Sequence, residues 1–175
     1  DDNNWLGFAG YRYHWAQSGE IHSDELNKII TKENFTEHIL KKIPDEWENE
    51  EVILGQKIKI NNWKLSKILK HAKKKFFLNP SNFIKSKQNI KLHFDVFHGD
   101  GLLDQAIDVL NKSDREEFRE FVSTESSFNR ENIFFCKSKN ILEKYFKSVF
   151  EWLEECENIF GFNLDGYAKT RIYAF

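Results

Sequence analysis

The sequence has only two cysteines, Cys136 and Cys156, among its 175 residues. A disulfide framework needs more cysteines, and a structural zinc site needs more cysteines or clustered histidines. We therefore predict two small, buried, apolar side chains in a reducing compartment. No apolar run approaches the roughly 18 residues of a membrane-spanning helix, and no signal peptide is visible.

Methionine is absent altogether, including at position 1. The chain opens on Asp1-Asp2-Asn3-Asn4. It closes on residues 171–175 without a glycine, proline or polar stop signal, as in the middle of a helix. We expect that both termini are cuts within a longer protein.

The familiar catalytic signatures are also missing. The chain has no P-loop, G-x-G-x-x-G, H-E-x-x-H or G-x-S-x-G motif. It also lacks D-x-D, the carboxylate pair with which many sugar transferases hold Mn²⁺ on a diphosphate. Neither the reaction nor a dependence on Mn²⁺ or Mg²⁺ can therefore be assigned from a motif.

The composition is that of a globular protein. Hydrophobic residues make up 40 %, aromatic residues 15 % and charged residues 31 % of the chain, and phenylalanine occurs 17 times. At this length about 70 % of the surface of the unfolded chain can be buried, so a hydrophobic core can form without disulfides or structural metal sites. We expect one domain over residues 1–175.

Apolar runs and helical periods alternate along the chain, which predicts α/β layering. We predict strands at residues 5–13, 52–54, 58–60 and 133–136. We predict helices at 23–30, 34–43, 63–77, 102–110, 113–122 and 138–160, with another beginning near 165. Residues 92–96 fit either state. Capping boxes are expected at residues 34–37 and 113–116, and Gly161 should end the longest helix.

Residues 52–94, the lysine-rich window, contain no aspartate or glutamate. Their eleven lysines are Lys57, Lys59, Lys64, Lys67, Lys70, Lys73, Lys74, Lys75, Lys85, Lys87 and Lys91. The rest of the chain has the other 15 basic residues and all 28 acidic ones, although the net charge is only −2. A segregated basic face of this kind attracts anions.

Three interpretations of the lysine-rich window stay open. The lysines can form a solvated face, or a surface that faces phosphate groups or anionic lipid. They can also bind nucleic acid, with Trp63, Phe76, Phe77 and Phe83 stacking on bases. However, the window has no arginine, the residue suited to bidentate phosphate contacts. The chain has no nucleic-acid motif either, so no nucleic-acid partner is expected.

Three short clusters are candidates for chemistry. Residues 10–14 follow a predicted strand, where Arg12 could pair with a diphosphate and His14 could act as a base or donor. The alternative is an arginine in a structural ion pair beside packed aromatic side chains.

The second cluster is His98-Gly99-Asp100-Gly101, in which two glycines allow a tight turn and close approach of a ligand. His98 and Asp100 could bind sugar hydroxyls or a metal. The alternative is that Asp100 is the N-cap of the following helix. The third cluster is residues 127–130, where Asn129 could hydrogen-bond a sugar or form an Asx turn before the apolar strand.

Taken together, these clusters resemble a bacterial family of capsular and exopolysaccharide biosynthesis domains. That family has an early strand that reads hydrophobic-Gly-Leu-x-His-Tyr-Arg-Arg-Tyr. Residues 5–13 are similar to it and keep Tyr11 and Arg12, with Gly10 for the histidine and Tyr13 for the second arginine.

The later motifs of the family follow in the same order. A His followed by an Asp-Leu helix corresponds to residues 98–103. A Phe/Tyr-Asn pair before a hydrophobic strand corresponds to residues 128–136, and an aromatic helix with Trp-Leu to 145–153. The opening of the closing Arg-x-x-Gly-Phe helix corresponds to residues 171–175, with Ala174 for glycine.

The resemblance implies a GT-A-type fold, a mixed sheet flanked by helices and here truncated at both ends. It also implies a cytoplasmic glycosyltransferase of surface-polysaccharide biosynthesis, with a nucleotide-sugar donor and a saccharide or lipid-linked acceptor. Peripheral contact with the inner membrane is an open expectation. Nucleotide-binding strands would precede Asp1, so the 175-residue piece alone should be inactive.

The implied roles fall on seven residues. His98 and Asp100 would be catalytic, and Tyr11, Arg12, His14, Asn129 and Arg171 would bind substrate. The competing hypothesis is a non-catalytic module that uses the lysine-rich window to bind membrane lipid or nucleic acid.

Overall fold

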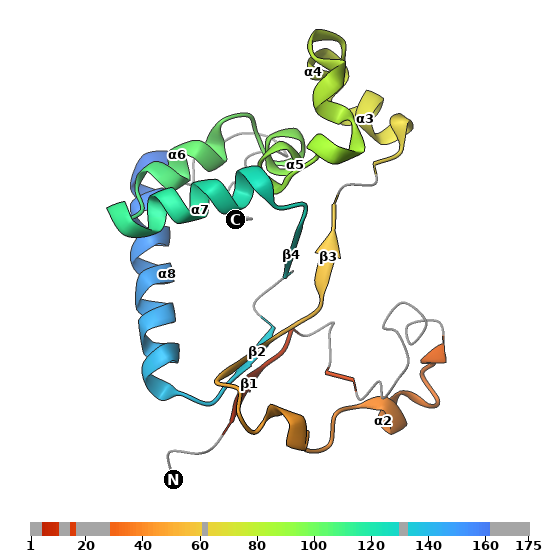
Figure 1. The fold of residues 1–175 in the computed structure, drawn as a ribbon, viewed down its shortest axis with the longest axis vertical. Coiled ribbons are helices and arrows are strands. Elements are labelled where there is room, and N and C mark those ends of the chain that lie inside the picture. The colour runs from red at the N-terminus through yellow and green to blue at the C-terminus, as the bar shows by residue number, and fades with distance from the viewer. Residues whose placement is uncertain (1–4, 11–14, 17–28, 61–62, 130–132, 162–175) are drawn as a thin grey trace. The chain divides into compact units, whose positions relative to one another are not determined.

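The structure, a computed structural model, describes residues 5–10, 15–16, 29–60, 63–129 and 133–161. The chain divides into two compact units, each built from two separate stretches (Figure 1). The first unit comprises residues 1–56 and 130–143, and the second comprises 57–129 and 144–175. The described part mixes helices with small antiparallel sheets, which confirms the α/β class. The single-domain organisation stays a prediction.

The first unit contains a three-stranded antiparallel sheet in the order β1–β5–β2. Its strands are β1 (Leu6–Phe8), β2 (Val52–Leu54) and β5 (Phe134–Cys136). In the central strand β5, Cys136 lies opposite Leu6 on one side and Val52 on the other. The strands predicted at 52–54 and 133–136, and the beginning of the one predicted at 5–13, are confirmed.

Aromatic side chains pack against this sheet. A Cβ atom on Gly7 would lie 2.3 Å from the ring of Phe135, so only glycine lets that ring lie across β1. The Phe135 ring is 4.9 Å from that of Trp15 and 5.5 Å from that of Trp47, between centroids. The Trp15 Nε1 donates a hydrogen bond of 3.2 Å to the Phe8 carbonyl oxygen.

Two short helical elements also lie among the described residues of this unit. They are α2 (Phe35–His38) and the 3₁₀ turn η1 (Asp45–Trp47). The helix predicted at 34–43 is wrong beyond His38, because Ile39 is extended and bridges to Ala16. The capping box is also wrong, because the Asn34 side chain bonds the preceding turn, accepting from the Thr31 N–H at 2.7 Å. The helix predicted at 23–30 lies almost wholly outside the described residues.

The second unit is mainly helical. In its described part, β3 (Lys57–Lys59) and β4 (Ser127–Asn129) pair antiparallel. The helical elements between them are α3 (Leu65–His71), α4 (Lys73–Leu78), η2 (Pro80–Phe83), η3 (Lys85–Lys87), α5 (Ile90–Phe97), α6 (Leu102–Asp108) and α7 (Lys112–Thr124). Most of α8 (Lys139–Phe160) also belongs to this unit.

Three expectations for this unit need correction or resolution. The helix predicted at 63–77 is two helices, because Ala72 has a non-helical backbone with φ −130° and ψ 25°. Residues 92–96 are helical, since the Asn89 side chain caps α5 by accepting from the Leu92 N–H at 2.8 Å. The capping box at 113–116 is wrong, because Asn111 is the N-cap of α7 and accepts from the Asp114 N–H.

The main core of the second unit lies between α5, α6 and α7. It consists of the buried side chains of Phe94, Leu103, Ile107 and Val122. Helix α8 is tied to α6 by a hydrogen bond of 2.6 Å from the Trp152 Nε1 to the Ala106 carbonyl oxygen. A smaller core cluster of Ile68, Ala72 and Phe83 lies beneath α3 and η2.

The predicted burial of the two cysteines and the predicted limits of the longest helix are confirmed. Cys136 and Cys156 are both buried and free. Ser138 caps α8 by accepting from the Ile141 N–H at 3.3 Å. Gly161 follows the helix in the left-handed region, at φ +60°, a conformation that favours glycine.

Candidate functional site

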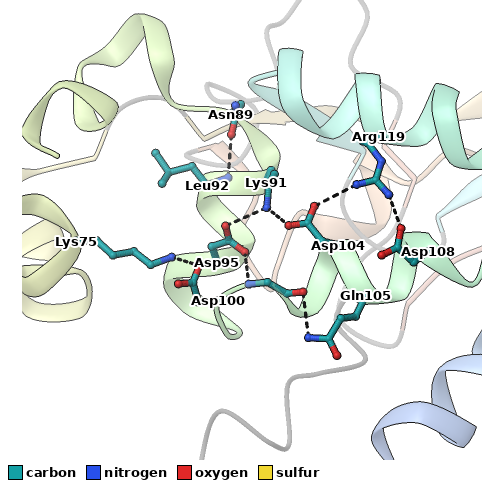
Figure 2. Close-up of polar contacts among 11 residues, drawn as sticks. Lys75, Asn89, Lys91, Leu92, Asp95, Asp100, Asp104, Gln105, Asp108 and Arg119 are labelled. Carbon is teal, nitrogen blue, oxygen red and sulfur yellow. Dashed lines mark hydrogen bonds and ion pairs between the residues drawn. The ribbon is translucent and has the colours of Figure 1, made fainter. Parts of the chain in front are cut away.

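The α5–α6 loop, residues 98–101, is held in a defined turn. Gly99 and Gly101 have positive φ values of 135° and 73°, so the two glycines make the turn that their spacing predicts. A Cβ on Gly99 would also lie 2.3 Å from the Leu102 side chain. From α5, the Asp95 Oδ1 accepts the Gly101 N–H at 3.1 Å (Figure 2). The loop is therefore fixed from both its backbone and its flanking helix.

Asp100 lies at the tip of this loop, and its side chain is 71 % exposed. Its carboxylate pairs with the Lys75 ammonium from α4 (Figure 2). The N-cap residue of α6 is Gly101, and no side chain caps that helix end. The alternative role of Asp100 as a helix N-cap is therefore wrong, and its carboxylate is directed to Lys75 and solvent.

A chain of ion pairs continues from the loop across α5, α6 and α7. Lys91 pairs with both Asp95 and Asp104, and Arg119 pairs with Asp104 and Asp108 (Figure 2). Burial by itself would lower the Lys91 pKa, but hydrogen bonds and charges from Asp104 and Asp95 raise it overall. Lys91 thus stays charged and holds Asp95, which in turn holds the loop.

His98 lies in the same loop as Asp100 but packs inward. Its ring centroid is 4.7 Å from that of Phe94, a core residue. Its backbone N–H donates to the Phe94 carbonyl oxygen at 2.7 Å, as the last bond of α5. The structure therefore brings the two predicted catalytic residues into one loop, with the Asp100 carboxylate at the surface and the His98 ring against the core.

Asn129 belongs to another element. It is the last residue of β4 and lies opposite Lys57 of β3. The Asx turn considered for it would continue into residues outside the described part of the chain, so that alternative stays a prediction. Tyr11, Arg12, His14 and Arg171, the other predicted substrate-binding residues, lie outside the described residues. Their roles stay predictions.

Sequence reasoning missed the residues that support the loop. Lys91 and Asp95 have the i,i+4 spacing of an ion pair on a helix. This pair could have been predicted only if residues 92–96 had been assigned to a helix. The pair of Lys91 and Asp104 joins α5 to α6, and the pair of Lys75 and Asp100 joins α4 to the α5–α6 loop. No local pattern marks such pairs.

His93 lies on α5 against the rings of Trp63 and Phe97, with centroids 5.5 and 4.8 Å away. Burial lowers its pKa to about 4, and nearby His98 and Lys67 act in the same direction. Between pH 6.5 and about pH 4, His93 is protonated in the unfolded chain but neutral in the native protein. Stability should therefore fall as the pH falls through this window.

We expect the wild type to lose about 1 kcal/mol of unfolding free energy between pH 7.5 and 5 through His93, a value reduced for its partial exposure. Urea denaturation of the wild type and His93→Gln at both pH values measures this loss. The variant should lose less, whereas the control His71→Gln, at an exposed histidine, should follow the wild type. Equal losses in the wild type and His93→Gln would contradict this assignment.

A shallow hollow of about 370 Å³ lies between α7 and α8 within the second unit. Aromatic and apolar side chains line it together with two carboxylates: Leu110, Asp114, Glu117, Phe118, Phe121 and Trp152. The Trp152 ring makes an edge contact with Phe118, at 5.7 Å between centroids. Aromatic faces beside carboxylates are compatible with a polar ligand that has apolar faces, such as a sugar.

Within the described residues, no group of three or more histidine, cysteine, aspartate or glutamate side chains could hold a metal ion. None of the helices in that part of the chain has the length and apolar character needed to cross a membrane. Comparison with known proteins found no family model, curated protein or solved structure that matches the chain.

Proposed function

We propose that the chain belongs to a glycosyltransferase of bacterial surface-polysaccharide assembly, built on a GT-A-type fold. The donor would be a nucleotide-sugar, and the acceptor a saccharide or a lipid-linked saccharide. The proposal rests on the ordered series of short motifs from residue 5 to residue 175 and on the geometry of the α5–α6 loop.

The observation that carries most weight is the exposed Asp100 carboxylate on its fixed loop beside Lys75. A carboxylate accepts hydrogen bonds from sugar hydroxyls and can take a proton from the attacking one. A neighbouring ammonium complements the charge that develops on a leaving diphosphate. Both groups bear a charge and reach solvent in one place, where a donor and an acceptor could contact them.

The reaction would be displacement at the anomeric carbon of the donor sugar. The acceptor oxygen forms a bond to that carbon while the carbon–oxygen bond to the diphosphate breaks, and its electron pair leaves with the diphosphate. Asp100 would receive the proton of the acceptor hydroxyl. Lys75 would lie near the departing charge, and His98 and Asn129 are proposed to contact sugar.

Binding of the donor is the experiment that tests this function. We expect a nucleotide-sugar from a panel of uridine, guanosine and thymidine diphosphate sugars to stabilise the complete gene product. At a ligand concentration of 100 times Kd, the gain is about 2.7 kcal/mol, which a thermal-shift assay detects readily. The free nucleoside monophosphates serve as controls. No shift with any member of the panel would contradict the proposal.

A further inference from the structure

Residues 73–87 of the second unit expose large apolar side chains to solvent. Phe77 and Leu78, at the end of α4, are each 68 % exposed, and Ile84, between η2 and η3, is 56 % exposed. Side chains of this size are usually withdrawn from water, and contiguous exposed patches mark interaction sites. We call these three residues the apolar tip.

The ring contacts of Phe76 connect the segments that carry the apolar tip. The Phe76 ring lies 5.8 Å from that of Phe77 and 5.6 Å from that of Phe83, between centroids. Phe83 is buried in the small core cluster, and Ile84 follows it directly. The packing of Phe76 on Phe83 therefore brings the end of α4 close to Ile84, so the exposed side chains belong to one region of the surface.

Four exposed lysines flank the apolar tip. Lys73 and Lys74 lie in the first turn of α4, and Lys85 and Lys87 lie in η3. None of this lysine quartet makes an ion pair with another described residue. The window from 52 to 94 contains no acidic residue to neutralise them. Lys75, by contrast, is paired with Asp100.

We propose that the apolar tip and the lysine quartet together form a docking surface for an anionic phospholipid bilayer. Phe77, Leu78 and Ile84 would enter the boundary between headgroups and acyl chains, and the lysines would lie on the phosphates. Apolar insertion and basic attraction are the two contributions that hold peripheral proteins on membranes. This inference does not depend on sugar transfer.

The composition of the surface favours lipid over nucleic acid. Leucine and isoleucine have no ring to stack on a base, although they partition into an acyl layer. The window also lacks arginine, the residue suited to bidentate phosphate and base contacts. A surface with two exposed aliphatic residues beside lysines therefore fits a bilayer better than a single-stranded polynucleotide.

Vesicle sedimentation tests the proposal directly. The protein should bind vesicles of phosphatidylcholine and phosphatidylserine and show little binding to phosphatidylcholine alone. Because each lysine near an anionic surface adds about fivefold to binding, replacing the lysine quartet with glutamine should weaken it about a hundredfold or more. Binding that is equal on the two vesicle types, or absent from both, would overturn the proposal.

A matched control separates this surface from net charge. Lys112, Lys139, Lys144 and Lys147 are also exposed but lie on α7 and α8. Their replacement by glutamine removes the same total charge and should change vesicle binding less than about threefold if the surface is local. An equal loss in both quadruple variants would show a diffuse charge effect and would overturn the docking surface.

A second set of variants tests the apolar tip. The double variant Phe77→Ser/Leu78→Ser should weaken vesicle binding at least tenfold, and the single variant Ile84→Ser should weaken it severalfold. The thermal midpoint of both variants should stay near that of the wild type. Unchanged vesicle binding in both variants would show that the apolar tip does not enter the bilayer and would overturn the proposal. Tighter binding to polyuridylate than to anionic vesicles would overturn it in favour of a nucleic-acid surface.

Discussion

Replacing Asp100 with asparagine is expected to lower the kcat of sugar transfer by about 10²- to 10⁴-fold, the usual contribution of a general base. Asparagine keeps the size of the side chain and removes its ability to accept a proton. The α5–α6 loop should persist, because Asp95 and the two glycines hold it independently of Asp100. Circular dichroism and the thermal midpoint verify the fold, and initial rates with the donor that stabilises the protein measure the effect.

Asp108→Asn is the matched control for this prediction. Asp108 is also an exposed carboxylate, 60 % accessible, that pairs with a cation, Arg119. It lies at the other end of α6, away from the loop. Its replacement should change kcat less than about threefold, since an exposed ion pair contributes little. If both variants had similar rates, Asp100 would have no catalytic role.

Replacing Ile107 with alanine is expected to lower the free energy of unfolding by about 2–5 kcal/mol. The Ile107 side chain is 0 % exposed and packs with Phe94, Leu103 and Val122, so it joins α5, α6 and α7. The smaller side chain leaves a cavity that these helices can fill only in part. Urea denaturation monitored by tryptophan fluorescence measures the loss.

The control is Leu65→Ala on α3, where the leucine is 56 % exposed. Little apolar contact is lost there, so we expect a change below about 1 kcal/mol. A cost for Ile107→Ala as small as that for Leu65→Ala would show that the three helices do not share this core. The loop between α5 and α6 would then lack the support that we infer for it.

The sequence predicts best those elements whose apolar pattern is complete in itself. Strand β5 follows from an uninterrupted apolar run, and α8 from a 3.6-residue period between Ser138 and Gly161. In both cases the signal and the packing coincide. The residue pattern alone predicts the element, whatever strands or helices pack against it.

The elements that were mispredicted depend on contacts that the residue pattern does not specify. Ala72 is a strong helix former, yet the helix breaks there, where it packs with Ile68 and Phe83. Residues 34–37 match the sequence pattern of a capping box, but the Asn34 side chain forms hydrogen bonds with Thr31 and Ile29 instead. Competition between local bonds of similar strength decides such positions.

The candidate site was predictable only in its backbone. The glycines at 99 and 101 mark the turn from sequence alone, because only glycine adopts such φ values readily. The partners of the loop are set by the packing of α4, α5 and α6, which places Lys75 next to a residue 25 positions away. Pairings over such distances follow from the fold, so the charge environment of Asp100 was not visible in the sequence.

The two proposals are chemically compatible but separable. A transferase that uses a lipid-linked acceptor needs access to a membrane surface, and the lysine quartet and the apolar tip would provide it. The Asp100 variant should lose transfer and keep vesicle binding, because Asp100 is not part of the docking surface. The lysine-quartet variant should lose vesicle binding and keep donor binding.

Sugar transfer itself is the most direct test of the proposed function. The complete gene product is incubated with each radiolabelled nucleotide-sugar of the panel and with saccharide or lipid-linked saccharide acceptors, and the labelled product is counted. We predict transfer from at least one donor, with release of one nucleoside diphosphate per sugar transferred. Absence of both transfer and donor hydrolysis across the panel would contradict the glycosyltransferase proposal and leave the non-catalytic binding module as the better account.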